Sequence, residues 1–217
     1  VVNDLAHFAG RNGIGAVMGS KKLRAIAVRG TQKAEPADPE PIKAWTRHAA
    51  EQVKTDGAML KTRHDKGTWY AVDVQQFAGG FLARNFSQAV FEGAGNINND
   101  AFQAISGGAE TCYACPVRCK RVVAVNDGPI QVDPMYGGPE YETIGALGSL
   151  CGIDDKVAIS KANELCNMYG LDTIGAGVTI GWAMDCFERG LITTADTGGI
   201  ELRFGNAGAM LQLVEDI

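Results

Sequence analysis

The chain has 217 residues, of which 46% are hydrophobic and 21% are charged, enough for one or two domains that bury a core. The net charge of −5 argues against a nucleic-acid-binding protein, which would present a basic stripe, and no apolar run approaches the roughly 20 residues that span a bilayer. Six cysteines are too few for a disulfide scaffold, and no secretory leader opens the sequence, so a cytoplasmic protein with free thiols is expected.

The first 41 residues predict a short helix, a strand and a linker. Residues 10–20 are rich in glycine and favour a tight turn that leads into a short helix. The partly β-branched and alternating residues 23–28 predict a strand. The prolines and charges of residues 30–41 indicate a linker between two domains.

The middle of the chain is predicted to hold one helix followed by irregular structure. Apolar residues recur at helical spacing over residues 42–53, namely Ile42, Trp45, Ala49 and Val53. Residues 67–98 are rich in glycine and aromatic side chains and are expected to be irregular.

The second half is predicted to be helical. Pro139 suits the first position of a helix that holds Ile144 and Leu147. Asp154 or Asp155 can cap the next helix, whose apolar face is Ala158, Ala162, Leu165 and Tyr169.

Glycines mark the ends and the packing of the later helices. Gly170 closes the helix that follows Asp155, and a third helix is expected over residues 173–189. The four-residue spacing of Gly177 and Gly181 indicates that a neighbouring helix approaches closely there. A last helix is expected to begin near Asn206.

Three cysteines within eight residues are the strongest chemical signal, at Cys112, Cys115 and Cys119. Residues three and four apart project from one side of a helical turn, so this spacing predicts three thiolates that converge on a soft metal centre. Both zinc and an iron–sulfur cluster satisfy these donors, and both usually take four protein ligands. A chance cluster of buried or disulfide-bonded cysteines is the structural alternative.

Two further motifs could bind a ligand. In the glycine-rich turn, backbone N–H groups can approach an anion, and Arg11 could add a bidentate phosphate contact. Near Gly170, Asn167 and Asp172 offer amide and carboxylate partners to a heterocycle rich in N–H and C=O groups. A structural glycine turn and an ordinary pair of helix caps are the respective alternatives.

Two carboxylates, Glu140 and Glu142, lie at the start of the predicted helix after Pro139. Acidic residues in a first helical turn gain about 0.3–1 kcal/mol from the helix dipole, which is a sufficient structural reason for both. The functional alternative is that one of them is a general base beside a reactive centre.

Taken together, these motifs resemble the tungsten-dependent aldehyde ferredoxin oxidoreductase family. The resemblance covers nearly the whole chain and is carried by residues 10–30, 83–86, 112–119, 138–172 and 187–190. Family members are far longer, so the resemblance implies an internal fragment. Residues 1–32 would be the C-terminal end of a β-rich pterin-binding N-terminal domain. Residues 33–217 would be a truncated, mainly helical second domain without the third, which gives an α+β fold class.

The resemblance implies an oxidoreductase that converts small-molecule aldehydes to carboxylic acids with ferredoxin as electron acceptor. The implied cofactors are a tungsten (or molybdenum) ion held by two pterins and a [4Fe–4S] cluster. The protein could form a homodimer or be part of a larger reductase complex. No nucleic-acid or membrane partner is expected. The alternatives are a catalytic or electron-transfer subunit of a larger tungsten or molybdenum reductase complex, and a zinc-stabilised binding module. We expect the fragment alone to be inactive and to hold no stable cluster.

Residue by residue, Cys112, Cys115 and Cys119 resemble three cluster ligands, with the fourth expected beyond Ile217. The residues that resemble pterin contacts are Arg11, Asn12, Gly13, Gly15, Asn167, Gly170, Leu171 and Asp172. Asn167 departs from the pattern, which has aspartate there, and so loses a charge-assisted contact.

Glu142 resembles the active-site carboxylate near tungsten, with Glu140 as the alternative if the alignment shifts. The family's catalytic histidine is expected beyond Ile217, because no histidine of this sequence fits its place. The remaining cysteines, Cys151, Cys166 and Cys186, are expected to be packing thiols.

Overall fold

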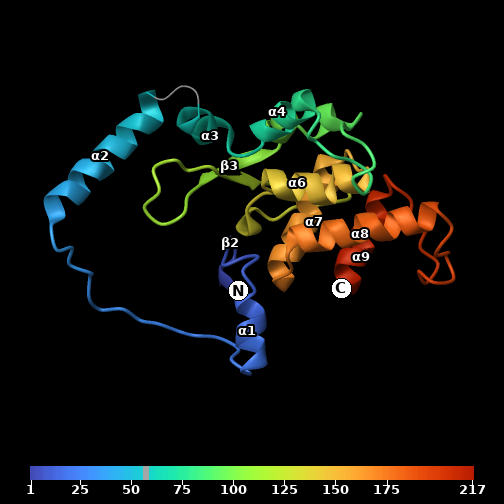
Figure 1. The fold of residues 1–217 in the computed structure, drawn as a ribbon, viewed down its shortest axis with the longest axis horizontal. Helices are drawn as coiled ribbons and strands as arrows, with labels where there is room; N and C mark the ends of the chain where they lie inside the picture. Colours follow the sequence, from blue (N-terminus) through green and yellow to red (C-terminus); the bar gives the residue numbers. More distant parts are fainter. Residues whose placement is uncertain (56–58) are drawn as a thin grey trace.

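Helices dominate the computed structural model, which describes residues 1–55 and 59–217 (Figure 1). The α-helices are α1 (Ile14–Ser20), α2 (Pro39–Thr55), α3 (Leu60–Lys66), α4 (Tyr70–Ala78), α5 (Asn99–Gln103), α6 (Tyr141–Leu147), α7 (Lys156–Tyr169), α8 (Thr173–Glu188) and α9 (Ala207–Asp216). Short 3-10 helices are η1 (Ala94–Asn96), η2 (Pro134–Tyr136) and η3 (Ser149–Cys151). The strands form two antiparallel pairs: β1 (Val2–Asp4) with β2 (His7–Phe8), and β3 (Ser106–Glu110) with β4 (Lys120–Val123). This composition agrees with an α+β class.

The N-terminal segment forms the β1–β2 hairpin and then α1, as the glycine-rich turn predicts. Gly13 precedes α1 in the left-handed conformation, with φ of 69°. The predicted strand over residues 23–28 is wrong, because these residues run extended without a paired strand in the described chain (Figure 1). A strand is stable only where a neighbour takes its hydrogen bonds, and here Ile26 and Val28 remain 69% and 86% exposed. Within residues 1–32 the paired strands are β1 and β2.

The linker and the first long helix follow the sequence prediction. Residues 21–38 cross from α1 to α2, which stands apart from the α6–α9 helices in Figure 1. The helix begins at Pro39, earlier than predicted, because proline suits a first helical turn. Val53 is buried, but Ile42 and Trp45 on the same apolar stripe are exposed.

The expectation of irregular structure over residues 67–98 is wrong in part, because α4 lies within it. Its glycines mark helix ends: Gly67 follows α3 and Gly79 follows α4, with φ of 65° and 71°. Trp69 is fully buried, and its indole N–H donates to the carbonyl of Pro139 at 2.6 Å. Trp69, Phe81 and Phe91 of this stretch therefore belong to the core, whereas Phe77 and Phe86 are exposed.

Local capping signals position the helices of the second half. Asp155 caps α7 by accepting from two backbone N–H groups, and Gly170 closes it with φ of 73°. Asp172 and Asn206 likewise cap α8 and α9. The first of these helices differs from its prediction, because α6 begins at Tyr141 and Pro139 lies just before it.

The close approach predicted for two glycines is confirmed. At Gly177 on α8, an added Cβ would lie 2.5 Å from the backbone carbon of Ala146 on α6. At Gly181, it would lie 2.9 Å from the carbonyl oxygen of Leu150 in η3. The two helices thus pack backbone to backbone and fix the start of α6 beside the start of α8. No helix in residues 1–55 and 59–217 is both long enough and apolar enough to cross a membrane.

Candidate functional site

Three neighbouring cavities surround the start of α8. The glycine-loop cavity, of about 330 Å³, lies between the Gly10–Gly15 turn and the turn at residues 167–174. The α6 pocket, of about 200 Å³, lies between α6, α8 and residues 80–86. The Glu140 cavity, of about 170 Å³, lies beside the loop before α6. Ile174 lines both the glycine-loop cavity and the α6 pocket, and Thr173 lines both the glycine-loop cavity and the Glu140 cavity. All three cavities therefore meet at the first turn of α8.

The glycine-loop cavity brings together both motifs predicted to contact a cofactor. Its lining includes Arg11, Gly13, Gly15, Asn167, Gly170, Leu171 and Asp172. Asn12 is not among its lining residues. The two motifs meet directly, because Arg11 Nη1 lies 2.6 Å from Asp172 Oδ2. Segments more than 150 residues apart in sequence therefore line one cavity.

Arg11 and Asp172 are held in place by more than their ion pair. Asp172 Oδ1 accepts from the backbone N–H of Ile174, so the same carboxylate caps α8. Arg11 has φ of 26°, a conformation that is rare for residues other than glycine. Since both side chains are about half exposed, their attraction stabilises the fold by at most about 1 kcal/mol. The main effect of the pair is to hold a guanidinium group at the cavity wall.

The structure gives a reason for asparagine at position 167. Asn167 Nδ2 donates to the backbone carbonyl of Tyr136 at 2.8 Å. An ionised aspartate has no proton to donate at this position. The amide oxygen of Asn167 has no hydrogen-bond partner in the described parts of the chain, so it remains available to a ligand.

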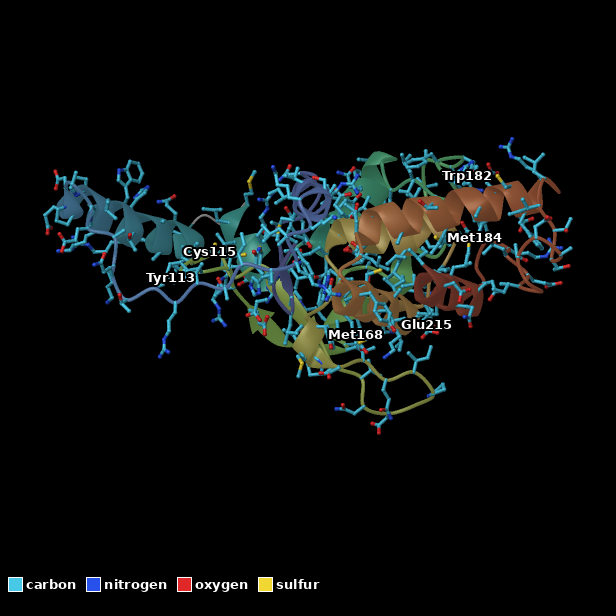
Figure 2. The ribbon with its side chains drawn as sticks, turned by 90° about the horizontal axis from the view of Figure 1, so that it is seen from below. Tyr113, Cys115, Met168, Trp182, Met184 and Glu215 are labelled. Carbon is cyan, nitrogen blue, oxygen red and sulfur yellow. The ribbon has the colours of Figure 1, made fainter. Side chains whose placement is uncertain are left out.

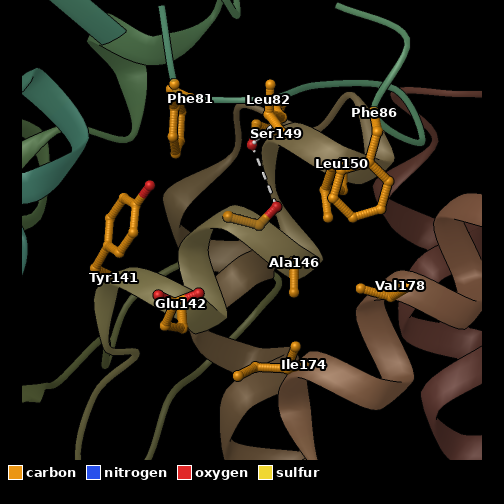
Figure 3. A pocket seen from close by; sticks show the side chains of 12 residues that line it. Phe81, Leu82, Phe86, Tyr141, Glu142, Ala146, Ser149, Leu150, Ile174 and Val178 are labelled. Carbon is orange, nitrogen blue, oxygen red and sulfur yellow. Dashed lines mark hydrogen bonds between the residues drawn. The ribbon is translucent and has the colours of Figure 1, made fainter. Parts of the chain in front are cut away.

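The α6 pocket contains Glu142 (Figure 3). Its other lining residues are mostly apolar: Gly80, Phe81, Leu82, Phe86, Tyr141, Gly145, Ala146, Ser149, Leu150, Ile174 and Val178. Figure 3 shows Tyr141 and Glu142 at one side of the pocket and Phe86, Leu150 and Val178 at the other. The pocket therefore pairs a single carboxylate with a largely apolar wall.

Glu140 lies in a different cavity from Glu142. Thr68 Oγ1 donates to Glu140 Oε2, and the same hydroxyl accepts from the backbone N–H of Tyr141 at 3.0 Å. Burial raises the pKa of Glu140, while the bond from Thr68 and the charges of Lys120 and Arg121 oppose that rise. The two candidate carboxylates can therefore be tested separately.

We expect Glu140 to make stability depend on pH. Because its pKa is raised in the folded protein, the folded state retains a proton that the unfolded state releases above pH about 4.5. Stability should therefore fall as pH rises from that value through the raised pKa. Replacing Glu140 by glutamine removes this fall. Urea unfolding of the parent protein and of the Glu140→Gln variant at a series of pH values measures this fall. Stability profiles that run parallel for the two proteins would contradict the prediction.

The predicted helical geometry of the cysteine run is wrong, because residues 112–119 form turns. Pro116 lacks an N–H group, and Ala114 and Arg118 have φ of 54° and 51°, outside the helical region. Cys112 is exposed, whereas Cys115 and Cys119 are half-buried. Within residues 1–55 and 59–217, no three or more His, Cys, Asp or Glu side chains are gathered as a metal site. The three thiols share one loop, where burial, the charge of Glu140 and the neighbouring thiols of Cys115 and Cys112 raise the pKa of Cys119.

A buried cation lies beside this loop. Arg121 is 8% exposed, its Nη2 donates to the carbonyl of His64, and its Nε–H has no partner among residues 1–55 and 59–217. An added Cβ on Gly67 would lie within 3.0 Å of Arg121 Cγ and Nε and of the Cys119 carbonyl oxygen, which shows how closely these groups pack. A buried N–H without a partner is costly. An anionic group held by the cysteines would offset that cost, so the surroundings fit a thiolate-bound cluster.

The cysteine loop also contacts the N-terminal hairpin. His7 Nε2 lies 3.3 Å from the carbonyl oxygen of Thr111, and Lys120 Nζ donates to the carbonyl of Ala6. Figure 2 shows Tyr113 and Cys115 near each other, between the outlying helix α2 and the part of the molecule that holds Trp182 and Met184. The candidate cluster loop is therefore on the side of the glycine-loop cavity.

The remaining cysteines lie outside these cavities. Cys151 and Cys166 are buried, and burial raises the pKa of their thiols to about 12 and about 11. This confirms that both are packing thiols. Cys186 is half-buried on α8. All six cysteines are free, which rules out the disulfide alternative in this structure.

Sequence reasoning missed several residues of the site. Thr68 carries no local signal, because only the fold brings it beside Glu140. Tyr141 lies between Glu140 and Glu142 in the sequence, and that position could have marked it. Phe86 lies within a stretch that carries the family resemblance, which could have marked it. Arg121 follows the last cysteine by two positions, and its place near the run could have singled it out.

Comparison with known proteins identifies the class. The sequence profile described as "Aldehyde ferredoxin oxidoreductase, domains 2 & 3" matches residues 44–217, and the profile for the N-terminal domain of the same enzymes matches residues 1–30. The chain belongs to the aldehyde ferredoxin oxidoreductase family.

Similar proteins include tungsten-containing aldehyde ferredoxin oxidoreductases of Thermococcus kodakarensis and Pyrococcus abyssi. The first is 37% identical over an alignment that covers all of this chain and 35% of the relative's own length. The second is 39% identical over an alignment that covers 95% of this chain and 34% of the relative's own length. An "Aliphatic sulfonate oxidoreductase, WOR-like subunit" of Pyrococcus furiosus is 27% identical over 99% of this chain and 34% of its own length. The chain thus spans about a third of the length of these relatives.

Proposed function

We propose that this chain is part of an enzyme that oxidises aldehydes to carboxylic acids and passes the electrons to ferredoxin. The contact between Arg11 and Asp172 carries the proposal, because it joins two candidate cofactor motifs in one cavity beside the pocket of Glu142. The names of the relatives support a tungsten enzyme. Residues 1–32 would end the N-terminal cofactor-binding domain, and residues 33–217 would form much of the second domain.

The glycine-loop cavity would hold a tungsten (or molybdenum) bis-pterin, and its residues fit such a group. Arg11 offers a cation, Asn167 an amide oxygen, and an added Cβ on Gly13 would meet no protein atom within 4 Å. The loop backbone is thus open to a close-fitting heterocycle with anionic groups. The residues proposed to contact it are Arg11, Asn12, Gly13, Gly15, Asn167, Gly170, Leu171 and Asp172. When bound, the metal centre supplies an acceptor for two electrons.

Glu142 is the proposed catalytic residue. Converting an aldehyde to an acid adds one oxygen from water and releases two protons and two electrons. The carboxylate of Glu142 lies at the wall of the α6 pocket, where it can orient a water molecule and take up its proton. Glu142 is exposed, so solvent water can reach its carboxylate there.

The proposed cluster ligands are Cys112, Cys115 and Cys119. Three cysteine thiolates suit a [4Fe–4S] cluster. They also suit a zinc ion, which the competing hypothesis of a zinc-stabilised binding module requires. The Nε–H of buried Arg121, which finds no acceptor in the part of the chain that the structure describes, supports an anionic group at this loop.

The metal content of the full-length protein tests this function. After anaerobic purification we expect about four irons per chain together with tungsten or molybdenum and pterin. Replacing Cys115 by serine should lower the iron content, and replacing Cys186 by serine should not. Protein that contains zinc alone, without pterin, would rule the proposal out.

A second candidate is favoured by one relative, the sulfonate oxidoreductase subunit. In that case the chain would belong to the catalytic or electron-transfer subunit of a larger tungsten or molybdenum reductase complex. Co-purification of the tagged full-length protein with stoichiometric partner subunits would support this candidate. A lone polypeptide that reduces ferredoxin with aldehydes would support the first.

A further inference from the structure

The guanidinium group of Arg121 lies between helix α3 and the cysteine loop. Its Nη2 donates to the carbonyl of His64 on α3, and His64 Nδ1 lies 2.9 Å from the carbonyl oxygen of Val117 in the loop. Arg121 Nε and the Cys119 carbonyl oxygen lie 2.9 Å and 2.8 Å from one point, the place of an added Cβ on Gly67. The fold therefore holds this cation beside the backbone of a candidate cluster ligand.

The positive charge of Arg121 is buried without complete pairing. The residue is 8% exposed, and its Nε–H has no acceptor within the described residues. Burial lowers the pKa of Arg121, and the charges of Cys119, Asp65 and Glu140 oppose that change. A guanidinium group stays protonated in proteins, so the chain keeps a buried charge with one unpaired donor. Such a group is costly unless an anionic acceptor faces it.

Two other cations next to the cysteines are placed differently. Arg118 is exposed, and its Nη2 donates to the carbonyl of Ala109 at 3.1 Å. Lys120 Nζ donates to the carbonyl of Ala6. Water and salt screen an exposed charge, whereas a buried charge acts through a medium of lower permittivity. Of these three cations, Arg121 is therefore the one placed to act strongly on negative charge held by the thiolates.

The negative charge of a cysteine-bound cluster depends on its redox state. Reduction adds one electron, which comes from the aldehyde, and oxidation passes that electron to ferredoxin. Net charge, solvent exposure and hydrogen bonds to the sulfurs set the reduction potential of such clusters. A hydrogen bond from a charged donor is roughly twice as strong as one from a neutral donor. A buried guanidinium group thus stabilises the reduced state more than the oxidised state.

We infer that Arg121 raises the reduction potential of the cluster proposed above, on which this inference rests. Its buried charge and its unpaired Nε–H favour the state that carries the added electron. The bond from Nη2 to His64 fixes the guanidinium group, so this effect needs no rearrangement when the electron arrives. Arg121 acts through the cluster and not on the substrate, which makes it a positioning residue.

Replacing Arg121 by methionine in the full-length holoenzyme should lower the reduction potential of the cluster. Methionine removes both the charge and the donor, and reduction should become about tenfold less favourable, which is about 59 mV for a one-electron couple. Arg121→Lys keeps a charge but loses the Nε–H group. That variant should retain its iron and show a smaller fall. Anaerobic redox titration followed by electron paramagnetic resonance measures the potentials.

Arg118→Met is the matched control, because it removes an equal charge from the same loop at an exposed side chain. Its potential should stay close to that of the parent protein. An equal fall in the Arg118 variant, or an unchanged potential in Arg121→Met, would overturn the inference. If Arg121→Met loses its iron, Arg121→Lys decides: an unchanged potential or a loss of iron in that variant would overturn the inference too.

The same titration separates this inference from the proposed function. A parent protein without an iron–sulfur signal overturns both. If the signal is present and shifts as expected but no aldehyde is oxidised, the role of Arg121 stands and the proposed reaction fails. If aldehydes are oxidised while the potential does not respond to Arg121, the inference alone fails.

Discussion

Replacing Glu142 by glutamine in the full-length protein is expected to lower kcat for aldehyde oxidation by about 100- to 10,000-fold, the usual contribution of a positioned general base. Glutamine keeps the size of the side chain but cannot take up a proton. Because Glu142 lies in the α6 pocket and outside the glycine-loop cavity, the metal and pterin contents should not change. Steady-state kinetics with metal analysis of the same preparation measure both effects.

The matched control for this variant is glutamine at position 140. Glu140 and Glu142 are two residues apart but line separate cavities, so an equal change in charge is introduced at a different place. Glu140→Gln should retain most of the turnover. The opposite pattern, with activity lost only in the Glu140 variant, would assign the catalytic carboxylate to Glu140. Full activity in both variants would reject a carboxylate base at this helix.

Replacing Gly177 by alanine should destabilise the protein by about 3 kcal/mol, the upper end of the usual overpacking range. The added Cβ would lie 2.5 Å and 2.6 Å from the carbonyl carbon and oxygen of Ala146, distances that no side-chain rotation can relieve. Helices α6 and α8 would have to separate. Urea unfolding of the variant and the parent protein measures the loss.

Gly145→Ala provides the comparison, since Gly145 also lies inside a helix but an added Cβ would meet nothing within 4 Å. Alanine there should raise the free energy of unfolding by about 0.5–1 kcal/mol, because it favours the helix over the flexible unfolded chain. Equal effects of the two substitutions would show that the close approach of α6 and α8 has no energetic consequence.

The helices of the second half could be predicted because their signals are local. Asp155 and Gly170 mark the two ends of α7, and Asn206 marks the start of α9. The spacing of Gly177 and Gly181 even predicted a contact, although not its partner. Side-chain caps and left-handed glycines act within one helical turn, so the sequence displays them directly.

The failed predictions depended on distant residues. The alternation of residues 23–28 is typical of a strand, but a strand forms only with a partner. The buried position of Trp69 depends on Pro139, 70 residues later in the chain. The sequence alone therefore could not reveal that a glycine-rich and aromatic segment contains part of the core.

The candidate site was predictable in composition but not in arrangement. Resemblance grouped Arg11 with Asp172, and the fold brings them into contact. The separation of Glu140 and Glu142 into two cavities could not be foreseen, because it depends on Thr68 and on the direction of each side chain at the start of α6. The spacing of the cysteine run predicted a helical turn, but Pro116 and two left-handed residues give the run a shape that spacing does not encode.

The first turn of α8 has one further consequence. Thr173 and Ile174 lie between the glycine-loop cavity, the α6 pocket and the Glu140 cavity. The preceding residue, Asp172, forms the ion pair with Arg11. Closely packed interiors transmit small displacements instead of absorbing them. A group bound on the Arg11 side would therefore contact the same helical turn that lines the pocket of Glu142.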